Sequence, residues 1–70
     1  MKIICRGCMV YVTVIESGVD CYNQPYEIAV SKGGRFFLGY YDPFNPSEHI
    51  WEYFSSIEKL INWKNTYITE

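Results

Sequence analysis

The chain has 70 residues, a formal net charge of −2, and a composition that is 49% hydrophobic and 19% aromatic. This length allows one domain with a thin core. No run of about 18 apolar residues is present, so no membrane-spanning helix is expected, and the N-terminal residues lack the apolar stretch of a secretory signal. The acidic balance argues against direct nucleic-acid binding, because phosphate contacts require a surplus of lysine and arginine. We expect a single cytoplasmic domain covering residues 1–70.

The first predicted strand spans residues 2–16, which are rich in β-branched side chains. From Met9 onwards, successive apolar side chains fall on alternate faces, as in a strand with both faces partly buried. Gly7 interrupts this stretch, and we interpret it as a bulge or bend within a continuous strand. Residues 17–25 contain many turn-forming residues and predict a loop.

A β-hairpin is predicted around the Gly33-Gly34 pair. Residues 26–31 and 36–41 have strand patterns on either side of these glycines, whose backbone favours a tight two-residue turn. With such a turn Ile28 is paired with Gly39, and the missing side chain leaves room for a neighbouring ring. Together with the first strand, this hairpin predicts an antiparallel meander.

An amphipathic C-terminal helix is predicted over residues 46–63. Asn45 is a suitable N-cap, Pro46 suits the first helical position, and Glu48 completes a capping box. Apolar residues then recur at helical spacing in one stripe, consisting of Ile50, Tyr53, Phe54, Ile57, Leu60 and Ile61. The predicted fold class is therefore α+β: a small antiparallel three- to four-stranded β-meander followed by one amphipathic helix packed on one sheet face.

Three cysteines and a single histidine are the candidate metal ligands. The two-residue spacing of Cys5 and Cys8 lets both thiolates reach one metal ion, and Cys21 and His49 complete a candidate tetrahedral zinc set. A redox-active thiol pair is a second interpretation. The odd number of cysteines without an export signal favours a third, in which all are reduced thiols and the protein needs neither metal nor cofactor.

The segment between Arg35 and Lys59 combines acidity with aromatic side chains. It contains four carboxylates, eight phenylalanine, tyrosine or tryptophan residues, and no lysine or arginine. One helix covers one face of a sheet, so some of these rings are expected to remain uncovered. On the predicted helix, Trp51 and Trp63 lie about 120° from the buried direction. Either a partner or a second copy of the chain covers such rings, or the N-terminal strand, the long loop or the tail does.

These features favour a non-enzymatic protein-binding module. No arrangement of residues identifies a reaction, exposed aromatic residues are frequent binding anchors, and unbalanced carboxylates favour a basic partner. The expected partner-binding residues are Tyr40, Tyr41, Asp42, Glu48, Trp51 and Glu52. In size, mild acidity and aromatic content the chain resembles the small inhibitors encoded by phages and other mobile elements, which implies inhibition of a basic, nucleic-acid-handling host protein. A zinc-binding domain and a structural homodimer joined through the uncovered sheet face are the alternatives.

Overall fold

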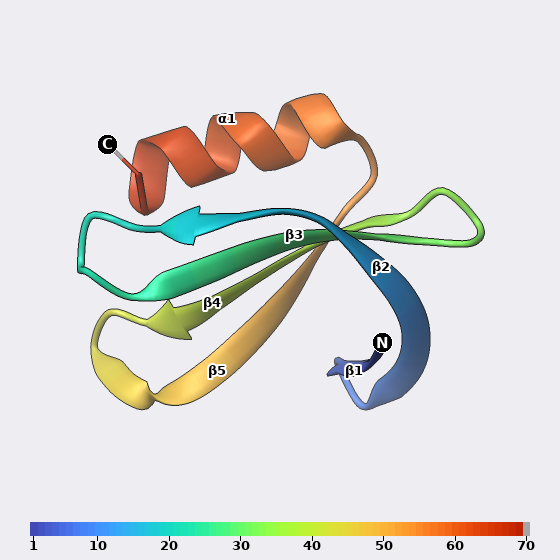
Figure 1. The fold of residues 1–70 in the computed structure, drawn as a ribbon, viewed down its shortest axis with the longest axis horizontal. Coiled ribbons are helices and arrows are strands. Elements are labelled where there is room, and N and C mark those ends of the chain that lie inside the picture. Colours follow the sequence, from blue (N-terminus) through green and yellow to red (C-terminus); the bar gives the residue numbers. More distant parts are fainter. Residues whose placement is uncertain (70) are drawn as a thin grey trace.

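The computed structural model describes residues 1–69, which form one five-stranded antiparallel sheet and a C-terminal helix (Figure 1). The elements, in chain order, are β1 (Lys2–Cys5), β2 (Cys8–Val19), β3 (Pro25–Ser31), β4 (Phe36–Asp42), β5 (Asn45–Phe54) and α1 (Ile57–Tyr67). Strands that follow one another in the chain are neighbours in the sheet. The predicted α+β class, an antiparallel sheet with one helix, is confirmed, with five strands in place of three or four. No helix in this part of the chain is long and apolar enough to cross a membrane.

A tight turn at Arg6 and Gly7 divides the predicted first strand into β1 and β2. Both residues have positive φ angles, 51° and 80°, as a two-residue hairpin turn of type I′ requires. The chain therefore reverses direction, and Cys5 lies directly opposite Cys8. The prediction of a continuous strand over residues 2–16 is wrong, because Gly7 lies in a turn that reverses the chain and not in a bulge.

The β3–β4 hairpin has the predicted position but a register shifted by one residue. Its turn contains three residues, 32–34, and Gly34 has a φ of 82°, the left-handed conformation that completes a three-residue hairpin loop. Ile28 is consequently paired with Leu38 and not with Gly39. A shift of one residue exchanges the two faces of a strand, so Leu38 shares a sheet face with Ile28.

The prediction of a helix over residues 46–63 is wrong for its first half. Asn45–Phe54 form β5, which pairs with β4. The supposed capping residue Asn45 begins a strand, and its Nδ2 donates a hydrogen bond to Glu48 Oε2 (3.4 Å). Aromatic residues are frequent in residues 49–54, and packing against a neighbouring strand outweighs local helix signals there.

Helix α1 begins only after Ser56. The Ser56 Oγ accepts a hydrogen bond from the Lys59 backbone N–H (3.2 Å), which satisfies one of the free donors of the first turn. Glu58 in the first turn and Lys64 in the last suit the helix macrodipole. Leu60 faces the sheet and is fully buried.

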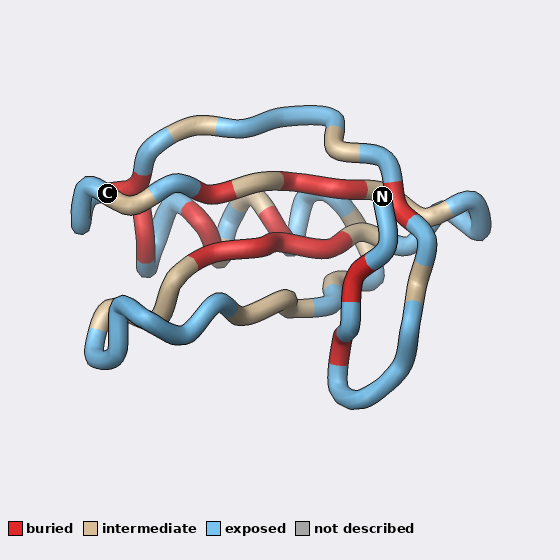
Figure 2. The backbone as a smooth tube through the Cα atoms, turned by 60° about the horizontal axis from the view of Figure 1, so that its bottom comes forward, coloured by how far each residue is buried: buried red, intermediate tan, exposed pale blue. Residues whose placement is uncertain are grey.

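Apolar side chains are buried on both faces of the sheet, and Figure 2 shows the buried residues concentrated in the central strands β3 and β4. On the face covered by α1, termed the helix face, the core consists of Tyr26, Ile28, Leu38, Tyr40, Leu60 and Ile68. On the opposite face, termed the hairpin face, the curved β2 carries β1 over the sheet (Figure 1). The core there consists of Ile3, Cys5, Val12, Ala29 and Phe37.

Both tryptophans pack against these cores. Trp63 on α1 lies on the helix face, with its ring centroid 5.2 Å from that of Tyr40 and 5.9 Å from that of Phe54. Trp51 belongs to β5 and packs on the hairpin face, where Cys5 Sγ donates a hydrogen bond to its carbonyl oxygen (3.4 Å). The helical-wheel placement of both indoles away from the core is wrong. Of the alternatives left open by the sequence, cover by the N-terminal strand holds for Trp51, which packs with Ile3 and Cys5 of β1.

Candidate functional site

One end of the molecule gathers carboxylates. The β2–β3 turn, the β4–β5 turn and the last turn of α1 all lie there, on the left in Figure 1, and we term it the acidic end. Its carboxylates belong to Asp20, Glu27, Asp42 and Glu48, of which only Asp20 is buried. Lys64 at this end is buried, with its ammonium group 5.0 Å from the Tyr26 ring centroid. No lysine or arginine within residues 1–69 forms an ion pair with any of these carboxylates.

The opposite end of the sheet is basic. Its cations are exposed in β1, in the β1–β2 and β3–β4 turns and in the first turn of α1, and belong to Lys2, Arg6, Lys32, Arg35 and Lys59. Glu52 and Glu58 partly balance them, and Arg6 lies 3.9 Å from the Glu52 carboxylate. An ion pair this exposed contributes little to stability. The fold thus separates charges that are mixed along the sequence.

Exposed aromatic side chains lie among the carboxylates of the acidic end. Phe44, in the β4–β5 turn, is 97% exposed, and Tyr22 in the β2–β3 turn and Tyr67 at the end of α1 are exposed as well. All three line one shallow hollow of about 360 Å³, together with Asp42. Single exposed apolar residues are ordinary, but several around one hollow are typical of a binding surface.

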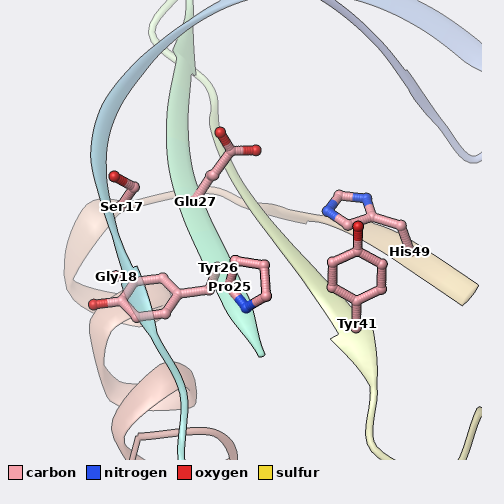
Figure 3. A pocket seen from close by; sticks show the side chains of 7 residues that line it. All are labelled: Ser17, Gly18, Pro25, Tyr26, Glu27, Tyr41 and His49. Carbon is pink, nitrogen blue, oxygen red and sulfur yellow. The ribbon is translucent and has the colours of Figure 1, made fainter. Parts of the chain in front are cut away.

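A second hollow, of about 380 Å³, opens on the hairpin face of the same end (Figure 3). Ser17 lies opposite Glu27 and Tyr41 lies opposite His49, and residues paired in this way project from one face. Figure 3 shows the Ser17 hydroxyl and Glu27 carboxylate on one side and the Tyr41 and His49 rings on the other. A carboxylate facing aromatic rings suits a cationic side chain.

An aromatic row on the hairpin face holds His49 in place. Its ring centroid lies 4.9 Å from that of Tyr41 and 5.3 Å from that of Trp51, and both contacts are edge-to-face. The Trp51 indole in turn lies on Gly39, where an added Cβ would be 2.7 Å from the ring. The prediction that Gly39 leaves room for a neighbouring ring is confirmed, although its partner in β3 is Glu27 and not Ile28.

The pKa of His49 is lowered, because packing partly removes its imidazole from water, and the Glu27 carboxylate opposes this shift. A histidine with a lower pKa in the folded state stabilises the fold fully above its unfolded pKa of about 6.5 and loses this contribution as the pH falls through its folded pKa. We therefore expect acidification from about pH 7.5 to 5 to lower the thermal unfolding midpoint more in the wild type than in His49→Gln. Parallel pH profiles for the two proteins in this range would contradict the assignment.

The structure brings together three of the six predicted partner-binding residues, namely Tyr41, Asp42 and Glu48, at the acidic end. Tyr40 is 8% exposed and belongs to the helix-face core. Trp51 is half-buried midway along β5, and Glu52 lies near Arg6 of the basic end. The predicted set therefore does not form one surface.

Sequence reasoning did not single out Tyr22, Glu27, Phe44 or Tyr67, which line the two hollows. The sequence does contain a feature that points to Glu27, since it is the one charged residue within β3. Another feature points to Phe44, because it follows a proline in a turn and an aromatic ring there has no strand face to join. Tyr22 and Tyr67 are distant in sequence, and only the folded meander brings them to the same end.

The four candidate zinc ligands do not meet. Cys5 and Cys8 flank the β1–β2 turn at the basic end, whereas Cys21 in the β2–β3 turn and His49 in β5 lie at the acidic end. Within residues 1–69 no three histidine, cysteine, aspartate or glutamate side chains are grouped as metal ligands. The geometry does not support the zinc-binding interpretation.

Comparison with protein-family models, with curated proteins and with solved structures found no match. The charge, exposure and shape of the acidic end are therefore the basis on which a function is inferred.

Proposed function

We propose that this protein is a small non-enzymatic module that binds a basic surface of a protein partner through its acidic end. The observation that carries the proposal is the convergence of accessible carboxylates and exposed aromatic rings there, with no lysine or arginine of residues 1–69 paired to those carboxylates. Clustered like charges repel one another in the free protein. A basic partner removes this repulsion, and the carboxylates steer its approach.

The two hollows suit different parts of such a partner. On the hairpin face, a guanidinium group fits between the Glu27 carboxylate and the Tyr41 ring, since arginine both forms ion pairs with carboxylates and stacks on aromatic faces. The other hollow offers Phe44, Tyr22 and Tyr67 as apolar anchors. Because Tyr40 and Trp63 of the helix face line this hollow, the two hollows open on opposite faces of the sheet, and a partner that fills both would extend around the acidic end.

Proteins that handle nucleic acids expose lysine and arginine along the path of the phosphate backbone. An acidic surface that covers this path competes with nucleic acid for the same cations. The module would therefore act as an inhibitor of such a protein, in keeping with its resemblance to the small inhibitors encoded by phages and other mobile elements.

Single charge reversals at the two ends of the molecule test the proposal. Glu27→Lys, Glu48→Lys and Glu58→Lys each remove one negative and add one positive charge, but Glu58 lies in the first turn of α1, away from the acidic end. With a hexa-arginine peptide as probe, calorimetric titration should show at least about tenfold weaker binding for the first two, roughly 1.4 kcal/mol. The affinity of the Glu58→Lys control for the peptide should fall by less than about threefold.

Circular dichroism of each variant establishes that the fold is retained. An equal loss in all three variants means that the peptide senses net charge alone. Unchanged binding in Glu27→Lys and Glu48→Lys rejects the acidic end as the docking surface.

A further inference from the structure

Cys5 and Cys8 are held opposite each other next to the β1–β2 turn. The two residues between them, Arg6 and Gly7, both have positive φ angles, so strand pairing continues up to the turn. Directly opposed residues of an antiparallel pair have Cα atoms about 4.5–5.5 Å apart, with side chains on one face. Disulfides bridge Cα separations of about 4.4–6.8 Å. The register therefore places the two Cα atoms within the range that a disulfide bridges.

The two thiols differ in accessibility. Cys5 is 6% exposed, and burial raises its pKa, with the Glu52 carboxylate adding to this shift and Arg6 opposing it. Its Sγ donates a hydrogen bond to the carbonyl oxygen of Trp51 (3.4 Å). Cys8 is exposed. An exposed thiol can react with an outside oxidant, and the thiol beside it can then complete a bond once it has lost its proton.

Both thiols line a hollow of about 500 Å³ at the basic end. Its other lining residues in the described chain are Val10, Phe37, Tyr53, Arg6 and Arg35, with no carboxylate among them. Arg6 also lies 3.9 Å from the Glu52 carboxylate, but an ion pair this exposed is weak. The two guanidinium groups beside apolar walls therefore favour a small anionic ligand. Glutathione disulfide is a small peptide disulfide with several carboxylates, and its charge matches this hollow.

We propose that Cys5 and Cys8 form a redox-active dithiol, which a small anionic disulfide of the glutathione class converts into an intramolecular disulfide. The Cys8 thiolate attacks one sulfur of the small disulfide, which forms a mixed disulfide and releases one small thiolate. Cys5 then loses its proton and attacks the Cys8 sulfur, which forms the Cys5–Cys8 bond and releases the second small thiolate. Two protein thiols are oxidised, one small disulfide is reduced to two thiols, and the two protein protons pass to the released thiols.

Oxidation has a structural consequence at β5. The Cys5 S–H group donates the hydrogen bond to the Trp51 carbonyl oxygen, and a disulfide sulfur has no proton to donate. This link between the β1–β2 hairpin and β5 is therefore lost on oxidation. Because Trp51 packs on the hairpin-face core, the redox state of the dithiol changes how firmly the hairpin is held over the sheet.

To test this proposal, the reduced native chain is equilibrated with glutathione buffers. Its free thiols are then alkylated, and its peptides are identified by mass. The peptides containing Cys5 and Cys8 should be found joined, with a mass about 2 Da below that of the two thiols. Cys21, the third free thiol, should remain alkylated or carry glutathione. The matched control Cys21→Ser should form the same bond to the same extent, and Cys8→Ser should not form it.

The same equilibration in concentrated urea separates a site built by the fold from a consequence of sequence spacing. Because the turn preorganises the thiols, the native chain should form the bond at a glutathione disulfide concentration at least about tenfold lower than the unfolded chain requires. Glutathione adducts without an internal bond, a bond to Cys21, or equal yields with and without urea would each overturn the proposal.

Discussion

Replacing Leu60 with alanine should lower the free energy of unfolding by about 2–5 kcal/mol, the cost of emptying a fully buried leucine site. Leu60 is 0% exposed and is fully buried in the helix-face core, against which Ile61 and Trp63 of α1 also pack. Domains of this size have unfolding free energies near the low end of about 5–15 kcal/mol, so the variant should be largely unfolded at moderate temperature. Urea unfolding followed by circular dichroism measures the change.

Ile57→Ala is the matched control for this prediction. Ile57 is on the same helix, one turn earlier, but is 39% exposed, so its loss should cost less than about 1 kcal/mol. The predicted helix over residues 46–63 placed both residues in one buried stripe and therefore implied similar costs. Equal destabilisation by the two substitutions would contradict the observed packing of α1.

Gly39→Ala should have the second largest effect on stability. Overpacking should lower the free energy of unfolding by about 1–3 kcal/mol. An added Cβ would lie 2.7 Å from the Trp51 indole, and the ring cannot retreat without leaving the hairpin-face core. The displaced indole should also enter water, so tryptophan fluorescence should shift to longer wavelength. Chemical unfolding and the emission maximum together check both effects.

Gly33→Ala provides the comparison, because its added Cβ would approach no atom more closely than 3.9 Å. Neither Gly33 nor Gly39 has a positive φ angle, so backbone strain does not distinguish the two substitutions. Gly33→Ala should change stability by less than about 1 kcal/mol. A Gly39→Ala protein with wild-type stability and emission would show that Trp51 is not packed on this glycine.

Local patterns were sufficient to predict an antiparallel sheet with one C-terminal helix, but not the boundary between β5 and α1. Asn45 and Glu48 have the spacing of a helix start. Ile50 and Phe54, four residues apart, satisfy helical spacing and the two-residue period of a strand equally well. Pairing with β4 decides in favour of the strand, and this long-range contact cannot be read from the spacing of residues within the segment.

The faces of β4 could not be predicted either, because they depend on the length of one turn. A two-residue turn at Gly33-Gly34 puts Tyr41 on the same face as Tyr26, whereas the observed three-residue turn puts Tyr40 there. This shift places one predicted binding residue in the core. The acidic and aromatic character of the site was apparent from composition, but its location required the fold.

The dithiol illustrates the same dependence on turn geometry. The spacing of Cys5 and Cys8 is equally compatible with a knuckle around a metal ion and with a hairpin. The positive φ angles of Arg6 and Gly7 make it a hairpin, so Cys5 and Cys8 are directly paired while Cys21 lies at the other end of the sheet.

The most direct test of the docking surface is a titration of the ¹⁵N-labelled protein with hexa-arginine peptide, in which changes in the amide chemical shifts are mapped onto the structure. The largest shifts should fall at the acidic end, on Ser17, Glu27, Phe44, Glu48 and His49, and should weaken as salt screens the carboxylates. Glu52 and Glu58 are the internal comparison, because they are carboxylates outside the acidic end. Largest shifts around those two residues, or shifts spread evenly over the chain, would contradict the assignment of the acidic end as the surface that binds a basic partner.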